Sequence, residues 1–177
     1  MKKLLCYFAA ATLLYSCQNT PPKTEDPSPT ILGYEIENDR KVAIVNGDQE
    51  SLKVIEQYFE AYNNKDLKTV ASLEHEDVIF YTHTAVIIEG SEKHMELSKG
   101  YLENYPNAQW DIIWSISAQV SFETKPEENW VTTCLNVSYG TGENKQNVQR
   151  IVDTQIMDNK IKKVYLYQRQ LTESEIN

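Results

Sequence analysis

Positive charge is scarce in this 177-residue sequence. It has 17 lysines and arginines against 26 aspartates and glutamates, which gives a formal net charge of −9, and its basic residues form no cluster. A chain of this charge repels phosphate backbones. Nucleic acid is therefore not an expected partner.

Long hydrophobic runs are missing as well. The apolar stretch from Leu4 to Tyr15 has twelve residues, too few for a membrane-spanning helix, which needs about 20. Because it follows Lys2 and Lys3, it has the length and setting of the hydrophobic part of a signal peptide. Residues 14–17, LYSC, then resemble the bacterial lipobox, in which the cysteine becomes the first mature residue and carries a lipid.

We therefore expect a lipoprotein signal peptide over residues 1–16 and lipidation at Cys17, with ordinary signal peptidase cleavage near Ala9 to Ala11 as the alternative. Residues 17–30 hold four of the six prolines and almost no apolar side chain, so they are expected to form a disordered tether. The expected location is the bacterial cell envelope, with the lipid in the membrane. Gln18 resembles sorting signals that favour the outer membrane.

Cysteine is too scarce for a disulfide framework. Cys6 leaves with the signal peptide and Cys17 is lipidated, so Cys134 has no partner within the chain. A nucleophilic Cys134 would need a histidine and an orienting group, and neither is near it in the sequence, so a buried strand cysteine is expected. The three histidines have no short ligand spacing, so no metal site is expected, and no cofactor either.

Helices are expected in the first half of the domain. Apolar residues at three- and four-residue spacing predict an amphipathic helix after the N-cap residue Asp48, and Asp66 caps a second, short helix. A third runs from about residue 92 to 104, before Pro106. Residues 31–50 are expected to form an arm across the domain edge. The apolar stripe of the first helix consists of Leu52, Ile55, Phe59 and Tyr62.

The second half of the domain changes to a period of two. From Ala108, apolar and polar residues alternate, which predicts a long strand with one packed face and one wet face, as in an antiparallel sheet. The predicted packed face consists of Trp110, Ile112, Trp114, Ile116, Ala118, Val120 and Phe122. Other strands are expected at 78–81, 85–89, 129–139, 146–157 and 160–171, the last two joined at Asp158-Asn159.

This order of elements predicts an α+β fold. Helices gathered before an antiparallel sheet cover one of its faces, and a strongly curved sheet over them forms a cone-shaped roll with a pocket inside. The domain is expected to span residues 51–171, followed by a loose tail at 172–177.

Several segments resemble the nuclear-transport-factor-2-like superfamily, in its SnoaL-like and ketosteroid-isomerase-like branches. They are YFEAYN at 58–63, KDL at 65–67, EDVIF at 76–80, Gly90, and the closing hairpin from 153 to 167. The resemblance implies the same cone fold. It also implies a pocket, which we expect to be lined by Tyr58, Tyr62, Thr82, Trp114 and Gln149.

The catalytic positions of ketosteroid isomerase are only partly filled. That enzyme uses an aspartate base, and a tyrosine and a protonated aspartate hold the oxyanion. The resemblance places the tyrosine at Tyr58, the base at Thr82 and the second acid at Gln149. A threonine does not accept a carbon-bound proton near neutral pH, so isomerisation by this route is not expected.

Other ionisable residues are weaker candidates. His83 or Asp111 could act as a base, whereas His75 and His94 are expected to be solvated. Arg150 and Asp153 could together orient a water, but their offset of three places them on opposite faces of a flat strand and argues against that role, so a surface or edge ion pair is the preferred interpretation. In epoxide-hydrolase-like relatives an Arg–Asp pair orients a water.

Three functional hypotheses remain. The first is a lipid-anchored binding protein that holds a small apolar or aromatic molecule without catalysis. The second is a small isomerase, cyclase or hydratase that uses His83 or Asp111 as the general base. The third is an assembly or interaction module that forms a homodimer through the outer face of the sheet.

Overall fold

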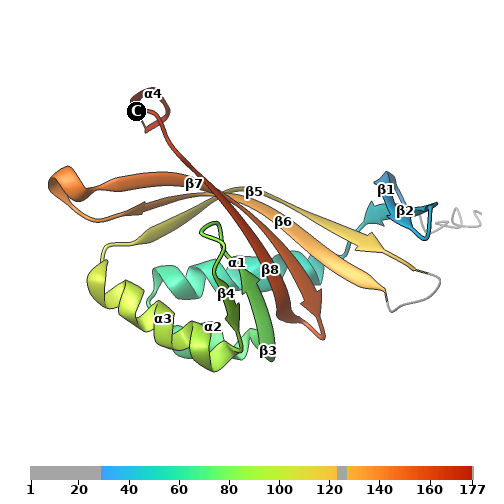
Figure 1. The fold of residues 1–177 in the computed structure, drawn as a ribbon, viewed down its shortest axis with the longest axis horizontal. Coiled ribbons are helices and arrows are strands. Elements are labelled where there is room, and N and C mark those ends of the chain that lie inside the picture. The colour runs from blue at the N-terminus through green and yellow to red at the C-terminus, as the bar shows by residue number, and fades with distance from the viewer. Residues whose placement is uncertain (1–28, 123–126, 177) are drawn as a thin grey trace, which may run out of the picture.

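One eight-stranded sheet curves over three helices (Figure 1). The structure is a computed structural model that describes residues 29–122 and 127–176. The strand order is β1-β2-β5-β6-β7-β8-β3-β4, and neighbouring strands are antiparallel except for the parallel pair β3 and β8. The predicted α+β fold is confirmed. The predicted signal peptide, Cys17 and most of the tether lie outside the described residues.

The three predicted helices begin where the sequence places them, whereas the expected loose tail after residue 171 contains a short helical turn whose Glu175 pairs with Arg169. The helices are α1 (Gln49–Asn63), α2 (Leu67–Ser72), α3 (Ser91–Asn104) and the final turn α4 (Glu173–Ile176), with a 3-10 turn η1 (Gly142–Asn144). The Asp48 side chain accepts a hydrogen bond from the Ser51 backbone at 2.6 Å, and Asp66 accepts one from Thr69 at 3.0 Å. Both predicted N-caps are therefore present. No helix in the described ranges is both long and apolar enough to cross a membrane.

The strands include one hairpin that the sequence shows only faintly. They are β1 (Ile31–Glu37), β2 (Arg40–Asn46), β3 (Glu74–Tyr81), β4 (Ile87–Glu89), β5 (Gln109–Val120), β6 (Glu128–Tyr139), β7 (Gln146–Met157) and β8 (Lys160–Gln170). The expected arm is the β1–β2 hairpin, which turns at Asn38 and Asp39 and adds to the sheet beside β5. Asp158 and Asn159 turn β7 into β8 with φ values of 51° and 57°, as predicted.

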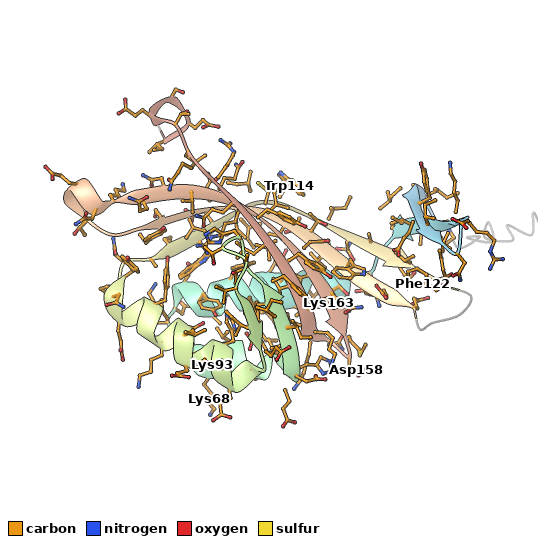
Figure 2. The ribbon with its side chains drawn as sticks, in the orientation of Figure 1. Lys68, Lys93, Trp114, Phe122, Asp158 and Lys163 are labelled. Carbon is orange, nitrogen blue, oxygen red and sulfur yellow. The ribbon has the colours of Figure 1, made fainter. Side chains whose placement is uncertain are left out.

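A bulge in β5 overturns the predicted single packed face of this strand. Trp114 pairs with Cys134 although Ile112 pairs with Leu135, so Ile113 is an extra residue. One extra residue exchanges the two faces of the rest of a strand. Trp110 is therefore buried, whereas Trp114 and Ile116 are 47% and 46% exposed. Figure 2 shows Trp114 on the side of the sheet away from the helices.

The core lies between the helices and the concave face of the sheet. Its fully buried side chains include Ile55 of α1, Val70 of α2, Val78 of β3, Leu135 of β6 and Ile161 of β8. Cys134 is also buried and free, which confirms its prediction as a buried strand cysteine. These residues leave part of the space between α1, α3 and the sheet unfilled, and this space is the candidate site.

Candidate functional site

A cavity of about 340 Å³ opens between α1, α3 and the concave face of the sheet. Most of its walls are apolar and aromatic, with a few polar groups, which is the usual make-up of a small-molecule site. Its lining residues are Ile55, Tyr58, Phe59, Tyr62, Phe80, Thr82, His83, Thr84, Ile88, His94, Leu97, Ser98, Tyr101, Trp110, Leu135, Arg150, Val152, Thr154, Ile161, Val164 and Leu166.

A buried carboxylate lies directly behind this wall. Glu74 begins β3 and is only 2% exposed. Its Oε1 accepts hydrogen bonds from the Tyr58 hydroxyl and from His94 Nδ1, both at 2.7 Å, and its Oε2 accepts one from the Ser91 hydroxyl at 2.8 Å. These three hydrogen bonds, from donors on α1 and α3, replace the hydrogen bonds to water that the carboxylate loses on burial.

His94 connects this carboxylate to the cavity. Because Nδ1 donates to Glu74, Nε2 is left as the acceptor of the ring, and the Tyr62 and Ser98 hydroxyls each lie 3.4 Å from it. The ring packs on Phe80 with centroids 3.8 Å apart. A carboxylate that fixes the ring orientation, with the second nitrogen facing a pocket, is the arrangement of an oriented general base.

The prediction that His94 is solvated is therefore wrong. Its side chain is 13% exposed and lines the cavity. The sequence contained a signal for this position, which is a polar and aromatic stripe along one face of α3. The stripe recurs at spacings of three and four residues and consists of Ser91, His94, Ser98, Tyr101 and Tyr105. Glu74 gave no such signal, since its donors lie 16 to 20 residues away in the chain.

Tyr58 and Tyr62, two of the expected pocket residues, lie in the wall of the cavity. Tyr58 donates its hydroxyl proton to Glu74, and burial raises its pKa well above the ordinary value. Burial also raises the pKa of Tyr62, whose hydroxyl is 2.8 Å from Ser98. Both tyrosines are therefore hydrogen-bonding groups that keep their protons at neutral pH.

Thr82 and His83 lie together at the rim of the cavity. They follow the end of β3 in a turn, where the opposite-face rule for strand neighbours does not apply, so both line the cavity. The Thr82 hydroxyl donates to the Val86 carbonyl at 2.8 Å, which fixes the turn. Burial, and then the charge of Arg150, lower the pKa of His83 below its ordinary value.

Three other predicted site residues lie outside the cavity. Gln149 is on the outer face of β7, bonded to Asn136 and Arg169, because its neighbour Arg150 takes the inward position. Trp114 is on the outer face because of the β5 bulge. Asp111 is exposed on β5 and does not line the cavity, so it has no position from which to act as its base.

Arg150 lines the cavity and brings a positive charge to its wall. The sequence did not predict this position. The expected ion pair with Asp153 does not form, since Asp153 accepts from Thr132 at 2.7 Å. Arg150 Nε instead donates to Gln168 of β8 at 2.9 Å. Burial lowers the pKa of Arg150, and the tyrosines Tyr101, Tyr139 and Tyr62 act against this.

Tyr101 stands beside this arginine. Its hydroxyl is buried and makes no hydrogen bond to any residue that the structure describes. Burial raises the pKa of Tyr101 to about 12, and the nearby guanidinium partly opposes that shift.

Within the described ranges, no group of three or more His, Cys, Asp or Glu residues could hold a metal ion.

Comparison with solved structures gives the class of this fold. A candidate ketosteroid isomerase from Kribbella flavida has a TM-score of 0.55 and 15% identity over 72% of this chain and 84% of its own. A candidate SnoaL-like polyketide cyclase from Shewanella denitrificans has a TM-score of 0.55 and 14% identity, over 69% and 92%. An LEH-like epoxide hydrolase from M. tuberculosis has a TM-score of 0.55 and 15% identity, over 68% and 83%.

These similarities show a SnoaL-like, nuclear-transport-factor-2-like cone fold. At such low identities they concern the fold alone. The sequence matches no profile of a known protein family and no curated protein. The chemistry of the cavity must therefore be argued from its own residues.

Proposed function

We propose that this domain binds a small, largely apolar or aromatic molecule in the cavity between α1, α3 and the sheet. The observation that supports this function is the cavity itself, whose volume of about 340 Å³ is near the lower end of the usual range for ligand sites. A domain of this size can fill its core with side chains, so a cavity with aromatic walls and few polar groups favours an occupant.

Native mass spectrometry tests this proposal on the full chain extracted from its own cells. We expect a co-purifying small molecule that is lost in Leu97→Trp, because Leu97 lies at the rim, 44% exposed, and a larger ring there fills the mouth. Lys99→Trp is the matched control on the same helix, since Lys99 points to solvent. Equal ligand occupancy in wild type and Leu97→Trp would refute binding in this cavity.

Proton-transfer catalysis is the second candidate function, and the Glu74–His94 pair favours it. Asp111 lies outside the cavity and His83 at its rim, so His94 replaces both as the proposed base. Nε2 would take a proton from a carbon next to a carbonyl of the bound molecule, with Glu74 holding the ring in place. Such a step suits an isomerase, cyclase or hydratase.

Deuterium exchange separates catalysis from binding. The ligand identified above, incubated in heavy water with the wild-type protein, should gain deuterium at an acidic carbon, and His94→Gln should abolish the gain while ligand still binds. His75→Gln is the control, because His75 lies outside the cavity. No gain of mass with the wild type would leave binding without catalysis as the function.

The anchoring of the protein is a separate proposal that rests on residues 1–17. We propose that it is a lipoprotein of the bacterial envelope, placed in the outer membrane by the lipid on Cys17. Mass spectrometry of the mature N-terminus should find a lipidated cysteine as the first residue. An unmodified N-terminus near Ala9 to Ala11 would support ordinary signal peptidase cleavage instead.

A further inference from the structure

Arg150 lies in the cavity without an acidic partner. It pairs across the sheet with Leu135, and both side chains line the concave side. Among the described residues, none of the ion pairs includes Arg150, and its one hydrogen bond goes from Nε to the neutral side chain of Gln168. The two terminal nitrogens make no hydrogen bond of normal geometry to a described residue, although the Tyr101 hydroxyl lies close enough to stabilise the charge.

An unpaired arginine in such a place is unusual. A charge taken from water needs a partner of opposite sign or several hydrogen bonds to compensate for the water. Among the described residues no acid lines the cavity, and Glu74 behind its wall already has three donors of its own. The tyrosines Tyr62, Tyr101 and Tyr139 lie near Arg150, and none of them supplies an acidic partner.

Gln168 gives the guanidinium a fixed orientation. Because Nε is held on β8, the planar group cannot turn freely, and its outer edge keeps two adjacent donors. Two parallel donors match the two oxygens of a carboxylate. The buried hydroxyl of Tyr101, which lacks a partner among the described residues, is a further donor on the same side of the cavity.

We propose that the molecule bound in this cavity carries a carboxylate, which Arg150 binds through its two terminal nitrogens while the apolar part of the molecule lies against the aromatic walls. This inference rests on the proposed function and adds the class of ligand, an aromatic or alkyl acid. The carboxylate replaces the water that the guanidinium loses and gives the orphaned Tyr101 hydroxyl an acceptor after a small side-chain movement.

The cavity then has two different polar ends. Tyr62 lies between them, under the influence of both Glu74 and Arg150. A carboxylate near Glu74 would be repelled, whereas one at Arg150 would be attracted, so charge alone sets the direction of the ligand. The apolar end of the acid then points toward His94 and Phe80.

Equilibrium dialysis of the full chain in lipid nanodiscs tests the proposal, with empty nanodiscs as the blank. The probes are naphthoate and its neutral analogue naphthamide, which differ in charge but hardly in shape. We expect naphthoate to bind about 10- to 100-fold more tightly, the range that a charge-assisted hydrogen-bond pair supplies. Arg150→Gln should remove this preference without weakening naphthamide, and Arg150→Lys should keep part of it.

Arg169→Gln is the matched control, because it removes the same charge from the outer face of the neighbouring strand. Thermal unfolding of each variant shows whether it is folded. Equal binding of both probes, both blocked by Leu97→Trp, would overturn the carboxylate and leave the pocket function standing. No binding of either probe would count against both proposals. Tighter binding of naphthyl phosphate than of naphthoate would overturn the carboxylate in favour of a phosphate.

Discussion

Replacing Glu74 by glutamine tests the hydrogen-bonded cluster behind the cavity. The amide keeps the size of the side chain but has one acceptor oxygen, so the three donors from Tyr58, Ser91 and His94 can no longer all be satisfied. A hydrogen bond to a charged group contributes about 1.5–3 kcal/mol, and an orphaned buried donor costs about 1–3 kcal/mol. The remaining amide oxygen can still accept some of these bonds, so the expected cost combines one lost charged hydrogen bond with one orphaned donor. We therefore expect a loss of about 3–5 kcal/mol in the free energy of unfolding.

The assay is urea unfolding followed by circular dichroism, with the slope of the transition checked against wild type. Glu76→Gln is the matched control on the same strand, because Glu76 is exposed, and its effect should stay within about 0.5 kcal/mol. A Glu74→Gln protein as stable as wild type would refute the compensation argument. A more stable one would mean that the chain keeps this carboxylate at a net cost, as functional sites do.

Three further predictions concern other parts of the chain. The pKa of His83, followed by NMR of its ring, should lie below the ordinary value of about 6.5 and rise in Arg150→Gln, because removal of the positive charge favours the imidazolium. Asp48→Ala should lower the free energy of unfolding by about 1 kcal/mol, through loss of the N-cap of α1. We propose a homodimer through the outer face, so Trp114→Glu should yield monomers by light scattering with unchanged fold.

Each of these predictions has an outcome that contradicts it. An unchanged pKa of His83 in Arg150→Gln would show that the two groups do not interact. For Asp48→Ala, a stability equal to that of wild type would mean that water replaces the cap. If the wild-type protein is already monomeric at high concentration, the proposed outer-face dimer is refuted, whatever the result for Trp114→Glu.

Much of the fold follows from local patterns. The N-caps of α1 and α2, the stripe of α1 and the β7–β8 turn depend on residues close together in the sequence, and all of them are where the sequence places them. The β5 bulge is different. Ile113 is apolar where the alternation calls for a polar residue, so the run Ile112-Ile113-Trp114 is the one local break in the pattern, and beyond it the same alternation resumes although the faces have exchanged.

The candidate site was harder to predict than the fold. Tyr58 and Tyr62 follow from the helix stripe, but the role of Glu74 depends on donors from two distant helices. Arg150 was missed because the position counted back from the hairpin fell on Gln149, one residue away. In a strand, one residue separates a pocket side chain from a solvent-facing one.

The β5 bulge also governs how this chain should be aligned with others. A relative without the residue equivalent to Ile113 would match this chain up to Ile112 and then place its inner residues against the outer ones here. Any transfer of site residues across that point is shifted by one position unless a gap is placed there. Deletion of Ile113, or insertion of one residue beside it, should therefore be tolerated less well than a substitution there, because either change would turn the apolar side chains of Trp114 and Ile116 inward.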